Sequence, residues 1–212
     1  MHVVVVAGSS LSTGLEAERL DEADLLIAVD GGAGAVIATG LVPSVLIGDM
    51  DSISATARRD LEALGVEVVL LEVAKDETDT EAALRLAVER GAGEITVYGA
   101  LGGPRLDHLL GNLLLLTSPW LDGVRVRMVD DLHEAFLVKR EAAFGGVRGD
   151  FVSLLPLTPE VEGVWTEGLL YPLAGETLHQ WSTRGMSNEM ISARARVTHG
   201  SGVLLLIHYL GR

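Results

Sequence analysis

The chain has 212 residues, enough for one large domain or two small ones, and its hydrophobic content of 48% is sufficient to build a core, which argues against a disordered protein. It contains no cysteine, which excludes disulfides, thiolate metal sites and cysteine nucleophiles and is compatible with a cytoplasmic location. The formal net charge of −14 disfavours nucleic-acid binding, and any phosphate substrate would need a divalent metal or a basic pocket to offset the repulsion.

The N-terminus is predicted to be a first strand rather than a signal peptide. Residues 1–8 contain neither a basic region nor a long apolar stretch. The longest apolar runs elsewhere, such as 113–116 and 203–207, are too short to span a bilayer. We therefore expect a soluble, cytoplasmic protein that does not enter a membrane.

Apolar runs and helical patterns alternate in the first part of the chain. Several of the runs are continuous in Val, Ile and Leu, which is typical of strands buried on both faces of a parallel sheet. The alternation predicts a three-layer α/β domain with a mostly parallel sheet. Strands are expected at 3–7, 25–29, 45–47, 66–71, 95–98 and 124–129, and helices at 54–64, 80–90 and 107–116.

The pattern changes after about Asp131. Short segments with strand character follow one another, Gly and Pro separate them, and no long amphipathic helix is present. This pattern predicts an antiparallel β-sandwich. We expect an α/β domain at 1–132 packed against a β-sandwich at 133–212, with sandwich strands at 135–139, 151–155, 163–167, 191–197 and 203–209.

Acidic residues and glycines follow the predicted strands of the first domain. In open α/β sheets, ligands bind outside the carboxyl ends of the strands. The polar residues that follow these strands are therefore expected to meet at one edge of the sheet and form a binding site. They are Gly8-Ser9-Ser10, Asp30-Gly31-Gly32, the segment 48–52, the segment 75–79 and the segment 99–108.

Asp49 and Asp51 stand two residues apart in Gly-Asp-Met-Asp-Ser. In an extended segment their side chains point the same way, so both carboxylates can reach one hard cation such as Mg²⁺. The alternative is a turn or a helix cap, with Asp51-Ser52 capping the helix expected from Ser54. The position of the two acids at a strand end favours the metal site.

Asp76 and Asp79 precede and begin the next predicted helix. Thr78-x-x-Glu81 matches a capping box, which would place Asp79 in the first helical turn. Capping and the helix dipole are sufficient to account for these residues, but an aspartate in that turn can also bind a metal at the sheet edge.

The segment after the fifth strand suits a phosphate group. Gly102 and Gly103 allow backbone N–H groups to approach an anion, and Arg105 supplies a charged fork, although an ordinary glycine-rich turn is the alternative. Asp107 begins a helix and could equally be a cap. His108 is expected to be structural rather than a ligand or an acid–base group.

Three common site motifs are absent from the chain. It has no Gly-x-x-x-x-Gly-Lys-[Ser/Thr], no Gly-x-Gly-x-x-Gly after the first strand and no Gly-x-Ser-x-Gly. These absences exclude a P-loop enzyme, leave dinucleotide binding unsupported and argue against an α/β-hydrolase.

Taken in order along the chain, the motifs resemble those of the thiamine pyrophosphokinase (thiamine diphosphokinase) family of the bacterial type. The resemblance covers nearly the whole chain, and the ordered set is more specific than any single motif. It rests on Asp30-Gly31-Gly32, the segment 48–52, the segment 76–79, the segment 102–108 with Asn112, and Gly185-Met186-Ser187-Asn188-Glu189.

This resemblance implies a homodimer with active sites between the subunits. The α/β domain would bind ATP and Mg²⁺, and the β-sandwich would bind thiamine and form the dimer. The implied reaction transfers a pyrophosphoryl group from ATP to the hydroxyl of thiamine and releases AMP.

The resemblance also implies roles for individual residues. Asp49, Asp51 and Asp79 match the magnesium ligands and, with Arg105 and Asp107, form the implied catalytic set. Ser187 and Asn188 match the segment that holds thiamine. The implied ATP and phosphate site comprises Asp30, Gly31, Lys75, Asp76, Gly102, Gly103, Arg105, Asp107 and Asn112.

Two positions depart from the family pattern. Pro104 is an insertion of one residue before Arg105, which leaves the direction of that guanidinium open. Lys75 stands where some relatives have glutamine, and its ammonium suits phosphate rather than thiamine.

Transfer of a pyrophosphoryl group needs positioning and charge neutralisation more than covalent help. Magnesium on the aspartates would neutralise the phosphate oxygens, and either Asp79 or Asp107 would accept the hydroxyl proton. Trp181 could stack on the cationic thiamine, or it could fill the sandwich core. The negative surface would attract thiamine.

Two further functions are consistent with the same residues. One is a metal-dependent phosphohydrolase acting on another phosphate ester, and the other is a non-catalytic nucleotide-binding regulator. The first predicts release of free phosphate, and the second predicts binding without turnover.

Overall fold

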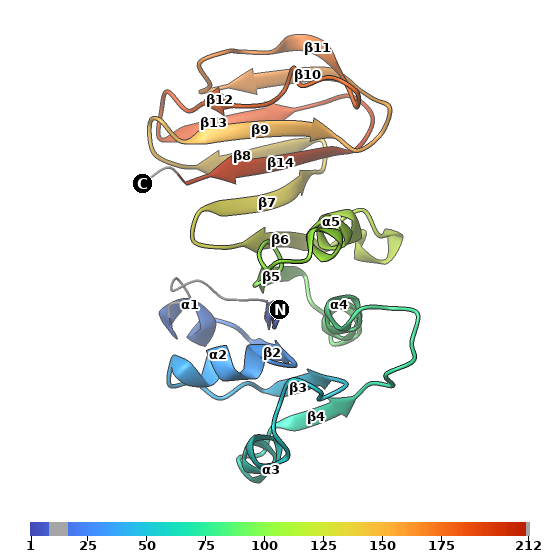
Figure 1. Ribbon diagram of the computed structural model, residues 1–212. Coiled ribbons are helices and arrows are strands. Elements are labelled where there is room, and N and C mark those ends of the chain that lie inside the picture. The colour runs from blue at the N-terminus through green and yellow to red at the C-terminus, as the bar shows by residue number, and fades with distance from the viewer. Residues whose placement is uncertain (9–16, 211–212) are drawn as a thin grey trace. The chain divides into compact units, whose positions relative to one another are not determined.

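The computed structural model describes residues 1–8 and 17–210. These residues form two compact units, Met1–Asp131 and Leu132–Arg212 (Figure 1). Ser9 and Ser10, which the sequence places after the first strand, lie outside the described residues.

The N-terminal unit is built on a parallel sheet. Its central strands, such as β1 and β3, are buried along almost their whole length, which explains their continuous runs of Val, Ile and Leu. The prediction of a parallel α/β sheet is confirmed. The strand order is β6 (Arg125–Val129), β5 (Glu94–Tyr98), β1 (His2–Val6), β2 (Leu25–Val29), β3 (Val45–Gly48) and β4 (Glu67–Leu70), and all neighbours are parallel.

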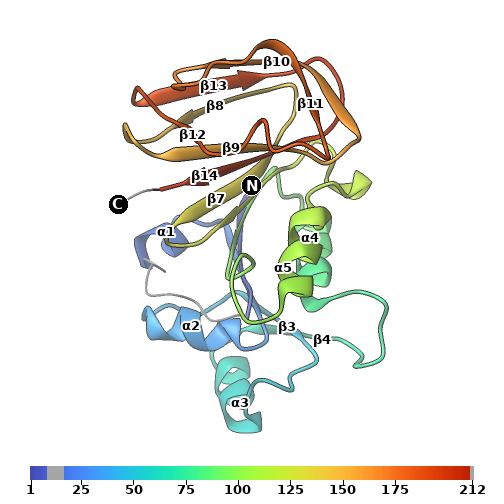
Figure 2. The same ribbon diagram turned by 45° about the horizontal axis from the view of Figure 1, so that its top comes forward.

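Helices cover both faces of this sheet. In both views α1 and α2 lie on one side and α4 and α5 on the other (Figures 1 and 2). Among the described residues, no helix combines the length and the apolar character needed to cross a membrane. The helices are α1 (Ala17–Asp21), α2 (Gly32–Ala38), α3 (Ala55–Ala63), α4 (Asp79–Glu89) and α5 (Leu106–Leu115), with a short 3₁₀ turn at Pro119–Leu121.

Helix α2 was not predicted from the sequence. Its seven residues, Gly-Ala-Gly-Ala-Val-Ile-Ala, carry no clear hydrophobic period. The small residues have a packing reason, because a Cβ on Gly32 would lie 2.2 Å from the carbonyl oxygen of Val6. Close approach of α2 to β1 therefore removes the side chains from which a helix is normally recognised.

Side-chain caps set the starts of α3 and α4. The Ser54 hydroxyl accepts a hydrogen bond from the Ala57 N–H at 3.1 Å, so Ser54, rather than Asp51-Ser52, caps α3. The Thr78 hydroxyl accepts one from the Glu81 N–H at 3.2 Å, which confirms the predicted cap and makes Asp79 the first residue of α4.

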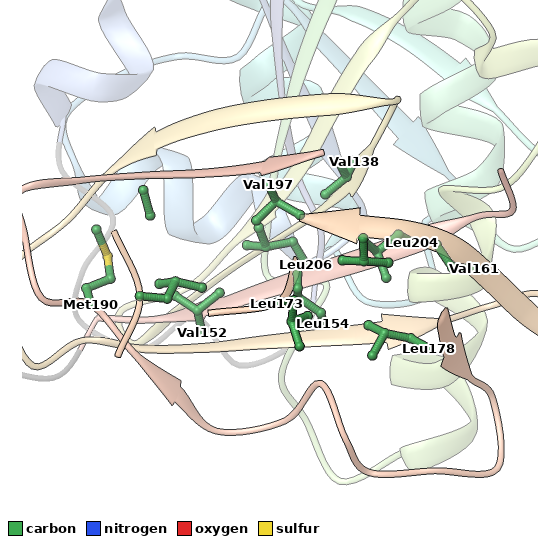
Figure 3. Packing of buried hydrophobic residues seen from close by; sticks show 13 residues of the cluster. Val138, Val152, Leu154, Val161, Leu173, Leu178, Met190, Val197, Leu204 and Leu206 are labelled. Atoms are coloured by element: carbon green, nitrogen blue, oxygen red, sulfur yellow. The ribbon is translucent and has the colours of Figure 1, made fainter. Parts of the chain in front are cut away.

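The C-terminal unit is a sandwich of two antiparallel sheets, as predicted. Apolar side chains from both sheets fill the space between them (Figure 3). The first sheet has the order β12 (Asn188–Glu189), β9 (Phe151–Pro156), β14 (Leu204–Tyr209) and β7 (His133–Val138). The second has the order β11 (Ala174–His179), β10 (Glu160–Glu167), β13 (Arg194–Thr198) and β8 (Glu141–Gly145).

A buried polar pair lies inside the sandwich. Asp150 and His208 are 3% and 1% exposed, and the Asp150 Oδ2 lies 3.0 Å from the His208 Nε2. The same carboxyl oxygen accepts a hydrogen bond from the Val147 N–H at 2.7 Å. Asp150 therefore partners one ring nitrogen of a core histidine and one N–H of the turn that precedes β9.

Replacing Asp150 with alanine should lower the free energy of unfolding by about 3 kcal/mol, because the buried His208 Nε2 and the partly buried Val147 N–H lose their partner. Urea unfolding measures the change. Arg184→Ala is the control, since its guanidinium binds the exposed Glu176 carboxylate and its loss should leave the unfolding midpoint nearly unchanged. Equal unfolding midpoints for the two variants would show that the buried pair contributes no more to stability than the exposed pair.

Candidate functional site

The ends of β2 and β3 bring the first acidic residues together. The two strands are parallel neighbours, with Val29 beside Ile47, and the Asp30 N–H donates to the Ile47 carbonyl oxygen at 3.0 Å. Residues that follow the two strands therefore emerge side by side at the carboxyl edge of the sheet.

Asp30 is held in a defined conformation at this edge. Its backbone has a φ of 44°, and its Oδ1 accepts a hydrogen bond from the Met50 N–H at 3.1 Å. A Cβ on Gly48 would lie 1.9 Å from that same oxygen. The Asp30 carboxyl thus occupies the space that a side chain at position 48 would need.

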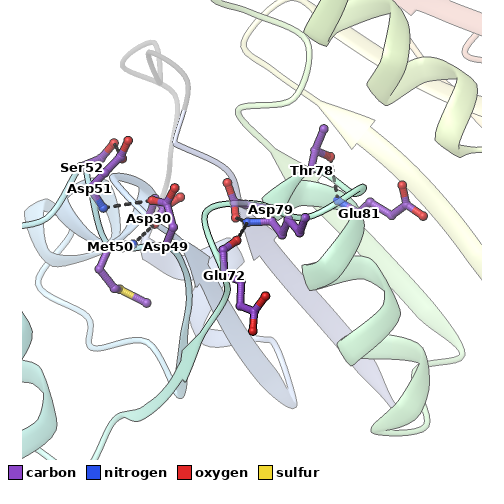
Figure 4. Close-up of polar contacts among 10 residues, drawn as sticks. Asp30, Asp49, Met50, Asp51, Ser52, Glu72, Thr78, Asp79 and Glu81 are labelled. Carbon is purple, nitrogen blue, oxygen red and sulfur yellow. Dashed lines mark hydrogen bonds and ion pairs between the residues drawn. The ribbon is translucent and has the colours of Figure 1, made fainter.

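Asp49 and Asp51 complete a group of three carboxylates. The Asp49 Oδ1 accepts a hydrogen bond from the Asp51 N–H at 3.0 Å, and the Ser52 hydroxyl donates to the Asp51 Oδ1 at 2.7 Å. One oxygen from each of Asp30, Asp49 and Asp51 lies within 4.8 Å of the others (Figure 4). A set of carboxylate oxygens at this spacing suits a hard divalent cation such as Mg²⁺.

The electrostatics of the group also favour a cation. The pKa of Asp30 is raised from its ordinary value of 3.8 to about 6, mainly by burial and in smaller part by the negative charges of Asp79 and Asp49, while the hydrogen bond from the Met50 N–H acts in the opposite direction. Negative charge is therefore costly at this position, and a bound cation would offset that cost.

Asp79 lies beside this group and is paired with Lys75. The Lys75 Nζ lies 2.6 Å from the Asp79 Oδ1 and 3.4 Å from the Glu72 carbonyl oxygen. Asp76, in the same loop, is exposed. Asp79 is therefore close enough to raise the pKa of Asp30, and the Lys75 ammonium is bound to the Asp79 carboxylate.

Arg105 and Asp107 form a separate pair. The Arg105 Nε and Nη2 donate to the two Asp107 carboxyl oxygens at 2.9 and 2.6 Å, and both side chains are 64% exposed. The guanidinium holds the pKa of Asp107 well below its usual range. His108 is also exposed, so it does not have the structural role expected from the sequence.

A side chain of α5 holds the backbone of the loop between β5 and α5. The Asn112 side-chain amide donates to the Ala100 carbonyl oxygen at 3.0 Å. Gly102 is half-buried and Gly103 is exposed, and Gly103 has a φ of 93°, which favours glycine. Gly31 lies beside Ser52, because a Cβ on Gly31 would be 3.8 Å from the Ser52 Cβ.

In the C-terminal unit, Asn188 uses its side chain to hold the neighbouring backbone. Its Oδ1 accepts from the Tyr171 N–H at 3.0 Å and from the Glu189 N–H at 2.9 Å, and its Nδ2 donates to the Tyr171 carbonyl oxygen at 2.6 Å. Ser187 has a φ of 56°, and its N–H donates to the Ser153 hydroxyl at 3.1 Å. These bonds fix the shape of the Ser-Asn segment.

Trp181 is 74% exposed and stacks on His179, with ring centroids 4.8 Å apart and an interplanar angle of 19°. The alternative that this tryptophan fills the sandwich core is therefore wrong. Its indole presents apolar aromatic surface to solvent, which suits stacking on a planar ligand.

Some of the residues predicted for the metal and nucleotide sites lie close together in the structure, and others do not. Asp30 joins Asp49 and Asp51, although the sequence assigned it to the nucleotide. Asp79 stands next to them, bound to Lys75. The signal that could have identified Asp30 is its position directly after β2, the strand that neighbours β3.

Comparisons with known proteins are consistent with this geometry. The family model described as thiamin pyrophosphokinase, catalytic domain, matches residues 17–128, and the model described as thiamin pyrophosphokinase, vitamin B1 binding domain, matches residues 137–204.

Individual relatives match over most of their length. The thiamine pyrophosphokinase of Bacillus subtilis (strain 168) is 30% identical over 189 residues, which cover 88% of each chain. Thiamine pyrophosphokinase 1 of Oryza sativa subsp. japonica is 25% identical, over 88% of this chain and 80% of the relative. The crystal structure of thiamine pyrophosphokinase from Bacillus subtilis superposes with a TM-score of 0.89 at 28% identity, over 100% of both chains. With both units matched in order, this chain belongs to the thiamine pyrophosphokinase family.

Proposed function

We propose that this chain transfers a pyrophosphoryl group from ATP to the hydroxyl of thiamine, giving thiamine diphosphate and AMP, in a reaction that requires Mg²⁺. The observation that carries the proposal is the group of Asp30, Asp49 and Asp51 at the carboxyl edge of the sheet. It lies within the part of the chain that matches the family's catalytic domain.

Asp49 and Asp51 are proposed as magnesium ligands, with Asp79 at the edge of the same site. The distances within the group support Asp30 as a further ligand. When bound, Mg²⁺ would neutralise phosphate oxygens and orient the β-phosphorus for in-line attack. The chain's own contribution is the fixed spacing of the carboxylates, which the Met50 and Asp51 N–H groups maintain.

The ATP phosphates are proposed to lie against the Lys75–Asp76 loop and the loop between β5 and α5. Arg105 is exposed and can exchange its Asp107 partner for a phosphate oxygen, because the guanidinium fork binds both anions in the same way. Gly31, Gly102 and Gly103 allow close approach of backbone N–H groups. Asn112 supports this site through its bond to the Ala100 carbonyl rather than through contact with ATP.

The proton acceptor for the thiamine hydroxyl is proposed to be Asp79 rather than Asp107. Both carboxyl oxygens of Asp107 accept hydrogen bonds from Arg105, which lowers its pKa and makes it a weak base. Asp79 pairs one oxygen with Lys75 and shares a side-chain hydrogen bond with Asp30, and among the described residues no second cation contacts its carboxylate.

Thiamine is proposed to bind to the C-terminal unit. Ser187 and Trp181 would contact it, and Asn188 would keep the Ser-Asn segment in shape. The exposed Trp181 ring suits the cationic, planar thiamine. We further propose a cytoplasmic homodimer in which the C-terminal unit contributes to dimer formation.

Incubation of the protein with ATP, Mg²⁺ and thiamine tests the function when the products are separated. The expected products are thiamine diphosphate and AMP in equal amounts. Release of free phosphate from ATP or small esters would indicate a phosphohydrolase, and nucleotide binding without any product would indicate a regulator. Either result would overturn the proposal.

Magnesium binding should depend on pH through Asp30, whose pKa is raised to about 6. Below that pH the folded chain holds a proton on Asp30 that a cation must displace, so Mg²⁺ affinity should fall by up to about tenfold per pH unit. For the metal-free protein the same raised pKa makes stability fall as pH rises from 3.8 to about 6.

Titration calorimetry with Mg²⁺ at about pH 5 and about pH 7 measures the effect, because those values lie on either side of the raised pKa. Asp30→Asn is the matched variant, since it cannot take up the proton and should flatten the pH profile. Equal affinities at the two pH values in the unchanged protein would contradict the prediction.

A further inference from the structure

Lys75 has an unusual position among the basic residues of the N-terminal unit. Within residues 1–8 and 17–210, it is the only basic side chain in an ion pair with Asp30, Asp49, Asp51 or Asp79. The nearby guanidinium groups bind acids outside that set: Arg85 binds Glu77 and Glu81, and Arg105 binds Asp107.

The Lys75–Asp79 pair is shielded from solvent more than a surface pair is. The two side chains are 17% and 29% exposed, and the Nζ–Oδ1 distance is 2.6 Å. The same Nζ donates a second, longer hydrogen bond to the Glu72 carbonyl oxygen at 3.4 Å. Screening by water and salt is therefore weaker than at a fully exposed pair, so the ammonium charge still acts on the neighbouring carboxylates.

An ammonium in this position opposes a divalent cation in two ways. It occupies an oxygen of Asp79, and its positive charge repels a metal bound by the neighbouring carboxylates. Without a nucleotide, the carboxylate group should therefore bind a metal more weakly than its charge suggests. Lys75 also has a flexible stem and freely rotating donors, so its ammonium can move to another oxygen close by.

We propose that Lys75 is a positioning residue that keeps the metal affinity of the nucleotide-free chain low and couples metal binding to nucleotide binding. When metal and nucleotide bind together, the ammonium leaves the Asp79 Oδ1 for a phosphate oxygen, and this oxygen becomes available to the metal, while the second oxygen of Asp79 remains for the hydroxyl proton. The two ligands then favour each other's binding. This inference rests on the proposed metal and nucleotide sites.

Lys75→Met tests the coupling with Mn²⁺ as the probe, because free Mn²⁺ is counted directly by electron paramagnetic resonance. Without nucleotide, the variant should bind Mn²⁺ about tenfold more tightly than the unchanged chain, because the opposing charge is gone. Its affinity for the Mn²⁺–ATP complex should fall by about tenfold, because a phosphate contact is lost. The two affinities should change in opposite directions, whereas a damaged fold would lower both the affinity for Mn²⁺ and the affinity for the Mn²⁺–ATP complex.

Two control variants separate charge at this position from charge in general. Lys75→Arg retains the positive charge and should keep Mn²⁺ binding weak. Arg85→Met removes a positive charge from α4, where the guanidinium binds Glu77 and Glu81, and should leave both affinities unchanged. Both controls can be checked for folding by thermal unfolding.

The proposal is overturned if Lys75→Met binds Mn²⁺ no more tightly than the unchanged chain, or if Arg85→Met shows the same gain. Its failure differs from failure of the proposed function. A chain that makes thiamine diphosphate while Lys75→Met shows no gain in Mn²⁺ affinity would refute only the coupling. A gain in Mn²⁺ affinity in a chain that makes no thiamine diphosphate would refute only the function.

Discussion

Asp49→Asn is expected to lower the rate of thiamine diphosphate formation by about 100-fold or more, with a corresponding loss of Mg²⁺ affinity. The asparagine keeps an oxygen in the position where the Asp49 Oδ1 accepts the Asp51 N–H at 3.0 Å. The local turn should therefore survive while one negative charge of the carboxylate group is lost. The variant therefore tests the negative charge of Asp49 while the shape of the turn is unchanged.

Initial rates measured over a range of Mg²⁺ concentrations test this prediction. Asp60→Asn is the control, since it removes the same charge from an exposed position on α3 and should retain full activity. Thermal unfolding should be nearly the same for both variants. Full activity of Asp49→Asn at every Mg²⁺ concentration would remove Asp49 from the metal site.

Gly48→Ala should disrupt the cluster of Asp30, Asp49 and Asp51 through a steric clash. The new Cβ would lie 1.9 Å from the Asp30 Oδ1, so the Asp30 side chain must leave and its bond to the Met50 N–H must break. The position also has a φ of 153°, which L side chains rarely adopt. We expect a loss of stability of about 2 kcal/mol and a fall in Mn²⁺ affinity of about tenfold or more.

Gly34→Ala is the matched control for this variant. Gly34 lies in α2, where an added Cβ meets nothing within 4 Å, and alanine there should be neutral or slightly stabilising. The double variant Gly48→Ala with Asp30→Gly removes the clash, so part of the stability should return while Mn²⁺ affinity stays low. Normal Mn²⁺ affinity in Gly48→Ala would contradict the prediction that a side chain at position 48 displaces Asp30 from the carboxylate cluster.

Several features of the N-terminal unit follow from neighbouring residues along the chain, and these could be predicted. Continuous Val, Ile and Leu runs indicated strands buried on both faces, and Thr78-x-x-Glu81 indicated the start of α4. The pairing of Asp49 with Asp51 is also local, since their spacing and a single backbone hydrogen bond bring the side chains together.

Elements whose residues carry weak patterns could not be predicted. Strand β12 has two residues, β8 and β11 contain Gly, Ala and Glu, and α2 consists mainly of Gly and Ala. Their conformations come from partners distant in the sequence: β8 is paired along its length with β13, and α2 packs closely on β1. Tertiary contacts override weak local preference in these elements.

The parallel α/β unit, the antiparallel sandwich and the paired-aspartate motif at a strand end can all be predicted from the amino-acid sequence, because each depends on residues a few positions apart. Three features could be seen only in the folded chain: Asp30 joins Asp49 and Asp51, Lys75 binds Asp79, and Trp181 is exposed. These outcomes depend on which strands are neighbours and on where each side chain finds a partner or solvent. Such relations join residues from different loops and strands, so spacing along the chain does not reveal them.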